Sequence, residues 1–340
     1  MLVTFIIPVL NGKGTIAEAL TSILNQKFDD MEIIVIDDNS CDGTENIVNK
    51  FTQKYSNVHL YENKITRGAS YCRNFGIKKA IGQWIFFVDS DDLLVANTLS
   101  MHLEYLQEEN DLVVGSYKQK KSNKSEVILN HNLGEKTVLD ENTLLPYVKR
   151  YCHEPYKYTL LVHCWGKFYQ RQKIEENDIL FDEKLSQLED VNFNFKYLMF
   201  CRKVFFTCDP VYVYRISDDS SSMSKKSGTE DMMFENMETA YSSVKYFINK
   251  EPPIINKFEA EALLNHLLAT TLIIWFIRLS RVFEFWGLYR TLRVHMKQAF
   301  GRGYIKSLVY MRGNSYLLHL FFKGNKPFLM ALMLKAKLFL

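Results

Sequence analysis

Residues 83–92 read QWIFFVDSDD, where a run of apolar side chains passes directly into aspartates. An unbroken apolar run of this length is typical of a strand that is buried on both faces of a parallel sheet. Asp89, Asp91 and Asp92 follow at the point where the strand would end. Because three carboxylates in four positions repel one another unless a cation lies among them, the stretch predicts a covered sheet with a charged site at its edge.

Three earlier segments have the same apolar character, and a helical pattern separates the first two. The apolar runs are LVTFIIPV at 2–9, EIIVID at 32–37 and NVHLYE at 57–62. In TIAEALTSILNQKF (15–28), apolar residues recur at helical spacing behind a helix start signal at Gly14 and Thr15. Alternating strands and helices predict an α/β fold with a mainly parallel mixed sheet and right-handed crossovers.

Polar residues follow three of these strands at their carboxyl ends. They are Pro8 and Asn11, then Asp37 and Asp38, then Asp89 and Asp91. In open α/β sheets, ligands bind in the crevice beyond the carboxyl ends of the strands. We therefore expect these residues to form one site, which is a better interpretation than an ordinary charged surface.

Asp89 and Asp91 lie two positions apart, so at the end of a strand both side chains would point to the same side. Two converging carboxylates suit a hard divalent cation, Mg²⁺ or Mn²⁺, which would also bind phosphate oxygens. Alternatively, these aspartates cap the following helix, ANTLSMHLEYL (96–106), and Asp92 is the best placed to do so. A DxD triplet is common by chance, and its position after an apolar strand favours the metal site.

The second half of the chain changes from shorter strands to helices. We predict a helix at 189–200, strands at 204–208 (VFFTC) and 211–215 (VYVYR), a linker at 216–230 (ISDDSSSMSKKSGTE) and helices from there onward.

Length and composition favour a folded soluble protein. The 340 residues suit one large domain with an appendage, and 47% hydrophobic and 24% charged residues are ordinary values. The six cysteines form no CxxC pair, which favours reduced thiols in a cytosolic protein. The start of the chain, MLVTFIIPVLN, resembles a buried strand more than a signal peptide. An uninterrupted apolar run of about 18 residues, which would indicate a membrane-spanning helix, does not occur.

Five motifs occur in an order that resembles the inverting glycosyltransferases of family 2, which have the GT-A fold. They are IIPVLN (6–11), ILNQKF (23–28), EIIVIDDNSCDGT (32–44), RGASYCRNFGIKKAIGQWIFFVDSDD (67–92) and QLEDVNFNF (187–195). The ordered set, which covers roughly residues 1–215, is far more specific than any one motif. The resemblance implies transfer of a sugar, with inversion, from a UDP-sugar donor to an acceptor hydroxyl, with Mn²⁺ or Mg²⁺ as cofactor.

The resemblance also implies roles for individual residues in binding the donor. The nucleotide-sugar-binding set would be Pro8, Val9, Asn11, Asp38, Arg73, Asp89 and Ser90. Within it, Asp38 would accept a hydrogen bond from the uracil, Asp89 would bind the ribose, and Arg73 would lie near the nucleotide and its phosphates. The chain departs from the family pattern at Cys72, where alanine is usual, and it lacks the histidine that some members have after YR at 214–215.

Two further aspartates would act in the transfer step. Asp91 would bind the metal, which neutralises the charge that develops on the leaving diphosphate. Asp190 would be the catalytic base, because the acceptor hydroxyl is a poor nucleophile until a carboxylate removes its proton. At the start of a helix, the helix dipole would help to keep Asp190 ionised.

Several of these assignments have a structural alternative. Asp190 and Glu189 could be first-turn acids that only stabilise the helix N-terminus. Asp38 could be a turn residue, unless Asp37 or Asn39 takes that role. Arg73 could be an ordinary charge on a helix surface.

Trp165 and Lys167, in HCWGKFYQ (163–170), could line an acceptor site, but a buried tryptophan is more often part of the core. The eight histidines show no metal-ligand spacing.

The charge of the chain is divided unevenly. Residues 270–340 contain 12 Lys and Arg but a single acid, Glu284, a balance of +11, whereas residues 1–269 have a balance of −8. The cations are mixed with large apolar residues, as in LIIWFIRLSRVFEFWGLYRTLRVHMK (272–297). This pattern favours an amphipathic region on an anionic membrane surface over nucleic acid. The alternative is a helical bundle that packs on the catalytic domain or on a partner subunit.

The sequence therefore predicts a GT-A domain at 1–215, with a nucleotide-binding half (1–110) and an acceptor half (111–215), followed by the linker and a helical region at 231–340. We expect a cytoplasmic enzyme, peripheral on the inner face of the membrane, that acts on a lipid-linked saccharide acceptor in bacterial capsule, exopolysaccharide or lipopolysaccharide synthesis. Alternatives are a non-catalytic nucleotide-sensing subunit and a sugar nucleotidyltransferase. The sugar, the linkage and the oligomeric state are left open.

Overall fold

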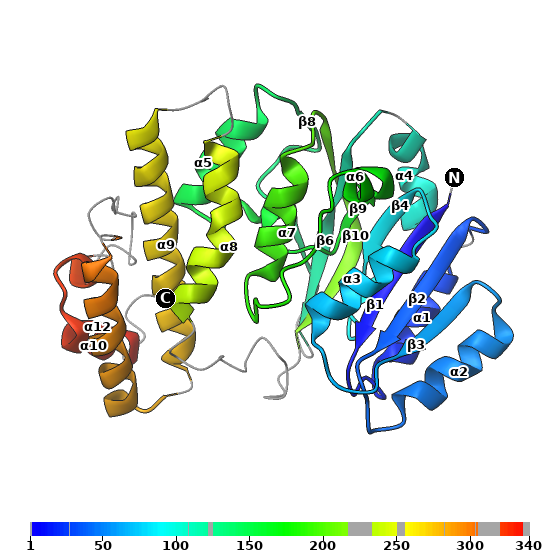
Figure 1. Cartoon of the computed structure of the whole chain (residues 1–340), viewed down its shortest axis with the longest axis horizontal. Coiled ribbons are helices and arrows are strands. Elements are labelled where there is room, and N and C mark those ends of the chain that lie inside the picture. Colours follow the sequence, from blue (N-terminus) through cyan, green and yellow to red (C-terminus); the bar gives the residue numbers. More distant parts are fainter. Residues whose placement is uncertain are drawn as a thin grey trace. The chain divides into compact units, whose positions relative to one another are not determined.

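A computed structural model of the chain describes residues 2–26, 28–107, 109–121, 125–216, 233–249, 256–281, 283–302, 304 and 320–335 (Figure 1). The expected linker at 216–230 lies outside the described residues, apart from Ile216. Two compact units are present: unit 1 contains residues 1–144 and 159–228, and unit 2 contains 145–158 and 229–340. Unit 2 thus includes a short segment, 145–158, that the sequence analysis assigned to the acceptor half.

Unit 1 is built on a mixed sheet. Its strands are β1 (Val3–Val9), β2 (Met31–Asp37), β3 (Val58–Glu62), β4 (Trp84–Phe87), β5 (Leu93–Leu94), β6 (Leu112–Lys121), β7 (Val127–Leu129), β8 (Lys136–Leu139), β9 (Lys167–Gln170) and β10 (Val204–Ile216). Its helices are α1 (Ile16–Leu24), α2 (Thr44–Lys54), α3 (Ala69–Lys79), α4 (Thr98–Gln107), the 3₁₀ helix η1 (Thr159–Leu161), α6 (Arg171–Glu176) and α7 (Glu189–Leu198). The four predicted apolar strands are β1 to β4, and the predicted helix at 189–200 is α7.

The order of strands in the sheet is β3-β2-β1-β4-β9-β6-β10-β5. The strands β3, β2, β1 and β4 are parallel to one another, and β9 runs antiparallel to both β4 and β6. Val9 of β1 pairs with Asp37 of β2, which pairs with Glu62 of β3, so the carboxyl ends of these strands meet at one edge. The predicted α/β fold class is confirmed.

Both faces of the sheet are covered at β1, where alternate side chains point to opposite sides and nearly all are buried. Phe5 and Ile7 belong to a core that includes side chains of α1. On the other face, Ile6 meets α3, and a Cβ on Gly76 would lie 2.4 Å from Ile6 Cγ2. Only glycine allows this close approach of helix to sheet. Arg73 lies on the same helix one turn earlier, so the packing at Gly76 also fixes the position of Arg73.

Strand β10 is longer than predicted. The segments VFFTC and VYVYR are parts of one strand, and the prediction of two strands is wrong. Register shifts against β6 lie between Thr207 and Pro210 and between Pro210 and Tyr212. Because proline has no N–H to donate to the ladder, the strand bulges at Pro210 and then continues. Its second part pairs with β5 and reaches the loop that contains Asp89 to Asp92.

Unit 2 is helical, as predicted. It contains α5 (Leu144–His153), α8 (Met233–Ile248), α9 (Lys257–Leu279), α10 (Phe285–Gly301) and α12 (Pro327–Lys335). The first residue of α5, Leu144, is assigned to unit 1. Helix α9 begins at the N-cap Asn256, whose side chain accepts a hydrogen bond from the Glu259 N–H at 2.9 Å. Among the described residues, α9 is the one helix long and apolar enough to cross a membrane, although 67% of its most apolar window is buried. Core helices pass the same test, so the finding is weak support for a membrane span.

Candidate active site

Two loops at the carboxyl edge of the sheet are held to each other. The Asn11 N–H donates to Ser40 Oγ at 2.8 Å, and Asn11 Oδ1 accepts from the Cys41 N–H at 2.9 Å. The Lys13 N–H donates to Asp42 Oδ2 at 3.0 Å. Asn11 has a φ of 53°, a conformation that asparagine tolerates better than most residues. The loop after β1 and the loop after β2 therefore form one rigid rim.

Asp38 holds a third loop at this edge. Its Oδ1 accepts hydrogen bonds from Asn63 Nδ2 and from the Arg67 N–H, both at 2.8 Å. Its Oδ2 accepts from the Gly68 N–H, also at 2.8 Å, and the residue is buried. Asp37 stabilises the turn, because its Oδ1 accepts from the Ser40 N–H at 2.8 Å. The interpretation of Asp37 as the turn residue is thus confirmed, and Asp38 joins the β2 and β3 loops.

Ser90 lies against the rim formed by the first loop. A Cβ on Gly12 would lie 2.5 Å from Val9 Cγ2 and 3.6 Å from Ser90 Oγ. The structure thus brings together Val9 and Ser90, which lie far apart in the sequence.

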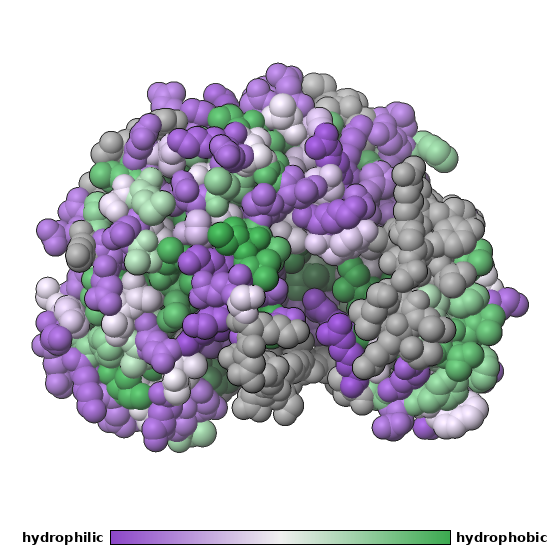
Figure 2. All heavy atoms as spheres, turned by 180° about the vertical axis from the view of Figure 1, so that it is seen from behind, coloured by the Kyte–Doolittle hydropathy of each residue, from purple (hydrophilic) through white to green (hydrophobic). Residues whose placement is uncertain are grey.

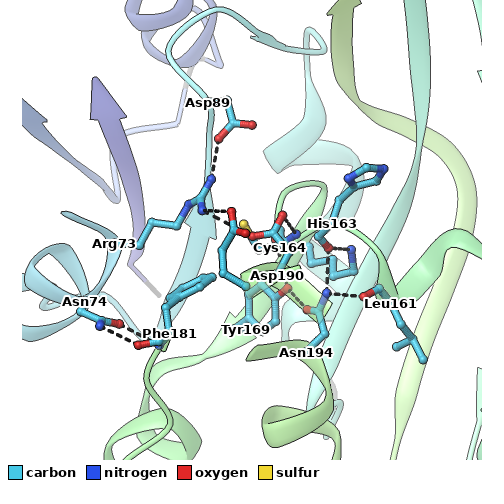
Figure 3. Close-up of polar contacts among 12 residues, drawn as sticks. Arg73, Asn74, Asp89, Leu161, His163, Cys164, Tyr169, Phe181, Asp190 and Asn194 are labelled. Atoms are coloured by element: carbon cyan, nitrogen blue, oxygen red, sulfur yellow. Dashed lines mark hydrogen bonds and ion pairs between the residues drawn. The ribbon is translucent and has the colours of Figure 1, made fainter. Parts of the chain in front are cut away.

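Arg73 lies at the centre of the charged site, between the loop after β4 and the start of α7 (Figure 3). Its Nη2 contacts Asp89 Oδ1 at 2.9 Å. Its Nη1 contacts Asp190 Oδ1 at 3.4 Å and Glu189 Oε1 at 3.6 Å. Arg73 is only 5% exposed, so the interpretation as a helix-surface charge is wrong. Arg73 is the cation that lies among the carboxylates. These surroundings favour a role for Arg73 in holding Asp89 and Asp190 over a role in direct contact with phosphates.

The loop before β9 orients Asp190 through the second oxygen of its carboxylate. Asp190 Oδ2 accepts a hydrogen bond from the Cys164 N–H at 3.1 Å. Asn194, one helical turn after Asp190, donates to the carbonyl oxygens of Leu161 at 2.9 Å and His163 at 3.0 Å (Figure 3). The loop that positions Asp190 is therefore tied to the helix that carries it. Cys164 and Asn194 were not identified from the sequence, where no pattern marks them.

Glu189 has a pKa shifted toward neutrality. Burial of its carboxyl group and the negative charge of Asp190 raise the pKa to about 7, while Arg73 opposes the shift. Near neutral pH, the Glu189 carboxyl group can therefore both bind and release a proton.

Asp92 does not cap a helix, and that interpretation is wrong. Its Oδ2 accepts from the Tyr212 hydroxyl at 2.9 Å, and its Oδ1 accepts from the Arg215 N–H at 2.7 Å. The Asp89 N–H donates to the same Tyr212 hydroxyl at 3.0 Å. Helix α4 begins only at Thr98. Asp92 is buried, and this burial together with the charges of Asp89 and Asp91 raises its pKa to about 8. Through Tyr212, Asp92 fixes the backbone of the aspartate loop.

Asp91 has the properties expected of a ligand for a divalent cation. It is exposed, and within the described part of the chain its carboxylate has no hydrogen bond or ion pair, whereas Asp89 and Asp92 are both engaged. Arg215 Nε donates to the Asp91 carbonyl oxygen, which leaves the side chain free. Among the described residues, no three His, Cys, Asp or Glu side chains lie together so that they could hold a metal. A cation at Asp91 would therefore take most of its oxygen ligands from phosphate and water, as Mg²⁺ commonly does.

Trp165 and Lys167 belong to the core. Both are buried, and the Trp165 ring stacks on Tyr212 with centroids 4.5 Å apart and an interplanar angle of 6°. Lys167 Nζ donates to the carbonyl oxygens of Trp165 and His163. The core interpretation of Trp165 is confirmed, and Lys167 is buried as well.

The Tyr212 hydroxyl provides a direct test of this arrangement. Tyr212→Phe would leave the Asp89 N–H and one Asp92 oxygen without a partner, and we expect it to lower the free energy of unfolding by about 1–3 kcal/mol. Urea unfolding measures this change. Tyr55→Phe is the control, because no hydrogen bond of the Tyr55 hydroxyl occurs within the described residues. If both variants matched the wild-type protein within about 0.5 kcal/mol, Tyr212 would not hold the loop.

Comparisons with known proteins identify the family. The family model "Glycosyl transferase family 2" matches residues 4–177. "Minor teichoic acid biosynthesis protein GgaB" of Bacillus subtilis is 30% identical over 222 residues, which are 64% of this chain and 23% of that protein. "Poly(ribitol-phosphate) beta-glucosyltransferase" of Bacillus spizizenii is 28% identical over 251 residues, 72% of this chain and 37% of that protein. The chain thus spans well under half the length of these two curated relatives.

Solved structures share the fold. S. aureus TarS in complex with UDP-GlcNAc has a TM-score of 0.68 at 20% identity, over 99% of this chain and 91% of that one. A mannosyltransferase from Pyrobaculum calidifontis in complex with GDP-Man and Mn²⁺ has a TM-score of 0.51 at 18% identity, over 99% of this chain and 84% of that one. At such identities these likenesses concern the fold alone.

Proposed function

Because this chain belongs to glycosyltransferase family 2, with a match that covers half its length, we propose that it transfers a sugar from a UDP-sugar to an acceptor hydroxyl with inversion. The observation that carries this proposal is the arrangement around Arg73. One buried cation joins Asp89, on the loop that follows a strand of the nucleotide-binding half, to Asp190, at the start of α7. This arrangement supports the assignment of Asp89 to donor binding and of Asp190 to the base.

The donor would bind across the rim at the carboxyl edge of the sheet. We assign the nucleotide and ribose to Pro8, Val9, Asn11, Asp38, Asp89 and Ser90. The loops that carry them are joined by the Asn11, Lys13 and Asp38 hydrogen bonds, which supports a preformed pocket. Arg73 would act beneath this pocket by holding Asp89.

In the transfer step, Asp190 would take the proton of the acceptor hydroxyl as its oxygen attacks the anomeric carbon of the sugar. The new C–O bond forms on the face opposite the diphosphate, and the bond from the anomeric carbon to the phosphate oxygen breaks, so that UDP leaves. Arg73 and the Cys164 N–H orient the Asp190 carboxylate for this role. A Mn²⁺ or Mg²⁺ ion held by Asp91 would neutralise charge on the diphosphate.

We further propose that the acceptor is a lipid-linked saccharide or polymer of the bacterial cell surface and that the chain works at the inner face of the membrane. The names of the two relatives, which refer to teichoic acid and poly(ribitol phosphate), support a surface polymer. The balance of +11 in residues 270–340 supports the membrane location.

The test is a screen of UDP-sugars for release of UDP in the presence and absence of Mn²⁺ or Mg²⁺. A glycosyltransferase releases UDP slowly by hydrolysis and faster with an acceptor. A nucleotide-sensing subunit would bind UDP without releasing it from any donor, and a sugar nucleotidyltransferase would instead form or consume nucleoside triphosphate. Either result would overturn the proposal.

Asp91→Asn tests the metal assignment. We expect this variant to bind UDP about tenfold or more weakly than the wild type when Mn²⁺ is present, because it loses the one free carboxylate of the aspartate loop. In excess chelator the two proteins should bind UDP equally. Calorimetric titration measures both affinities. Equal UDP binding by the two proteins with Mn²⁺, or full wild-type activity in chelator, would rule out Asp91 as a metal ligand.

A further inference from the structure

Helix α12 (Pro327–Lys335) in unit 2 is apolar on both of its faces. Its buried face consists of Met330, Ala331, Met333 and Leu334. Its other face exposes Phe328 by 47%, Leu329 by 41% and Leu332 by 50%. A helix that is apolar all round is normally covered on all sides. The exposed face of α12 therefore indicates a surface that meets a partner.

Aromatic rings extend this face onto α10 (Phe285–Gly301). The Phe328 ring lies edge-on to Phe285 and Tyr289, with centroids 5.6 and 5.9 Å apart. The Trp286 ring is 5.1 Å from Phe285 and 6.1 Å from Tyr289, and Trp286 is 63% exposed. We call this surface the aromatic patch; it consists of Trp286, Tyr289, Phe328, Leu329 and Leu332. Figure 2 shows hydrophobic surface on its right-hand side, where these two helices lie.

Cations flank the aromatic patch. Arg290, Arg293 and Lys297 are exposed on α10, at helical spacing from Trp286, so that all four lie along one side of the helix. Lys326 is exposed directly before α12. From residue 283 onward, the described residues include seven Lys or Arg and one acid, Glu284. The partner of this surface should therefore be anionic and should also offer an apolar phase.

We propose that the aromatic patch inserts at the interface of an anionic lipid bilayer, with Trp286, Phe328 and Leu332 below the headgroups and Arg290, Arg293 and Lys326 in contact with them. Tryptophan and tyrosine favour this interface because one end of each side chain is apolar and the other polar. A second copy of the chain is a poor occupant, because a symmetric contact would bring like charges together. Nucleic acid would leave Leu329 and Leu332 without an apolar partner.

This inference rests on the membrane association proposed above but does not depend on the transfer chemistry. It goes beyond that proposal in naming the two helices and the side chains that contact the bilayer. Salt should weaken the binding only partly, because ions screen the arginine and lysine contacts but not the burial of apolar side chains.

The test uses the full chain and sedimentation with vesicles of phosphatidylcholine, with and without phosphatidylglycerol. We expect binding to the anionic vesicles only. Trp286→Ser combined with Leu332→Ser should weaken it about tenfold or more, because both apolar anchors are lost. Arg290→Glu combined with Arg293→Glu should weaken it by a similar factor at low salt. These side chains are exposed, so the variants should remain folded, which circular dichroism checks.

Two controls carry comparable changes elsewhere in unit 2. Tyr246→Ser on α8 and Phe258→Ser at the N-terminal end of α9 remove aromatic side chains that are 67% and 84% exposed. Both variants should bind vesicles like the wild type. The inference is overturned if the full chain ignores anionic vesicles or if the Trp286/Leu332 variant binds them normally. It is also overturned if that variant instead converts a dimer to a monomer, which would make a second copy the occupant. UDP release without vesicles, measured in parallel, distinguishes failure of this inference from failure of the proposed enzyme activity.

Discussion

Asp190→Asn is expected to lower the rate of sugar transfer by about 10²–10⁴-fold while the affinity for UDP changes little. The amide cannot take up the proton of the acceptor hydroxyl, so the variant loses the proposed base. Its carbonyl oxygen can still accept the hydrogen bond that the Cys164 N–H now donates to Asp190. The shape of the site is therefore kept, and the loss should appear in kcat with the donor affinity preserved.

Glu189→Gln is the matched control for this experiment. It removes one carboxylate charge from the same helical turn and from the same cation, Arg73. Because the pKa of Glu189 is raised to about 7, Glu189 is the other residue that could act as a base near neutral pH. A larger loss of rate in Glu189→Gln than in Asp190→Asn would transfer the role of base to Glu189. A fall in UDP affinity as large as the fall in rate would instead assign Asp190 a structural role.

Arg73→Met is expected to lower the free energy of unfolding by about 3–5 kcal/mol, the usual cost of removing one partner from a buried ion pair. Methionine keeps most of the side-chain length, but Asp89, Glu189 and Asp190 are left without the cation that contacts all three. Urea unfolding at neutral pH measures the loss. Arg73→Lys is the control, because it retains the positive charge but not the two guanidinium nitrogens that reach Asp89 and Asp190 separately, and its loss should be intermediate.

The pH dependence of the Arg73→Met variant gives an independent check. Without the arginine, whose charge opposes the shift, the pKa values of Asp89 and Glu189 should rise further in the folded protein. A carboxyl group whose pKa is higher in the folded than in the unfolded state favours folding at low pH and disfavours it as pH rises between the two values. The destabilisation should therefore be smaller at about pH 5 than at about pH 8. A loss that is the same at both pH values, or that is under about 1 kcal/mol, would contradict a central electrostatic role for Arg73.

The first half of the fold was predictable from local patterns. The strands β1 to β4 are short apolar runs with charged or turn-forming residues at their ends, and a parallel sheet requires strands of this kind. The prediction failed at β10, where Pro210 interrupts the pattern but not the strand. A bulge keeps the two parts paired with β6 on either side of the proline, and no local feature of the sequence distinguishes a bulge from a turn.

The candidate site was predicted in its parts but not in its connections. Asp38, Arg73, Asp89, Asp91 and Asp190 were chosen from strand ends and motif order, and all but Asp91 have contacts that join elements remote in the sequence. Tyr212, Cys164 and Asn194 were missed. Each forms a hydrogen bond to a group at least 26 positions away in the chain, and such pairings leave no periodic trace.

By itself, the sequence determined the four parallel strands β1 to β4, the edge at which the polar residues gather, and the cationic and helical character of the C-terminal part. These properties depend on side-chain type and on periods of two or of 3.6 residues, which are local. Only the tertiary structure decided which of three aspartates is free, because Arg73 engages Asp89 and Tyr212 engages Asp92 while Asp91 stays exposed. It also joined Phe328 to the rings of α10 in one exposed patch. Both outcomes depend on which distant groups pack together, because packing assigns partners and burial that composition and spacing cannot specify.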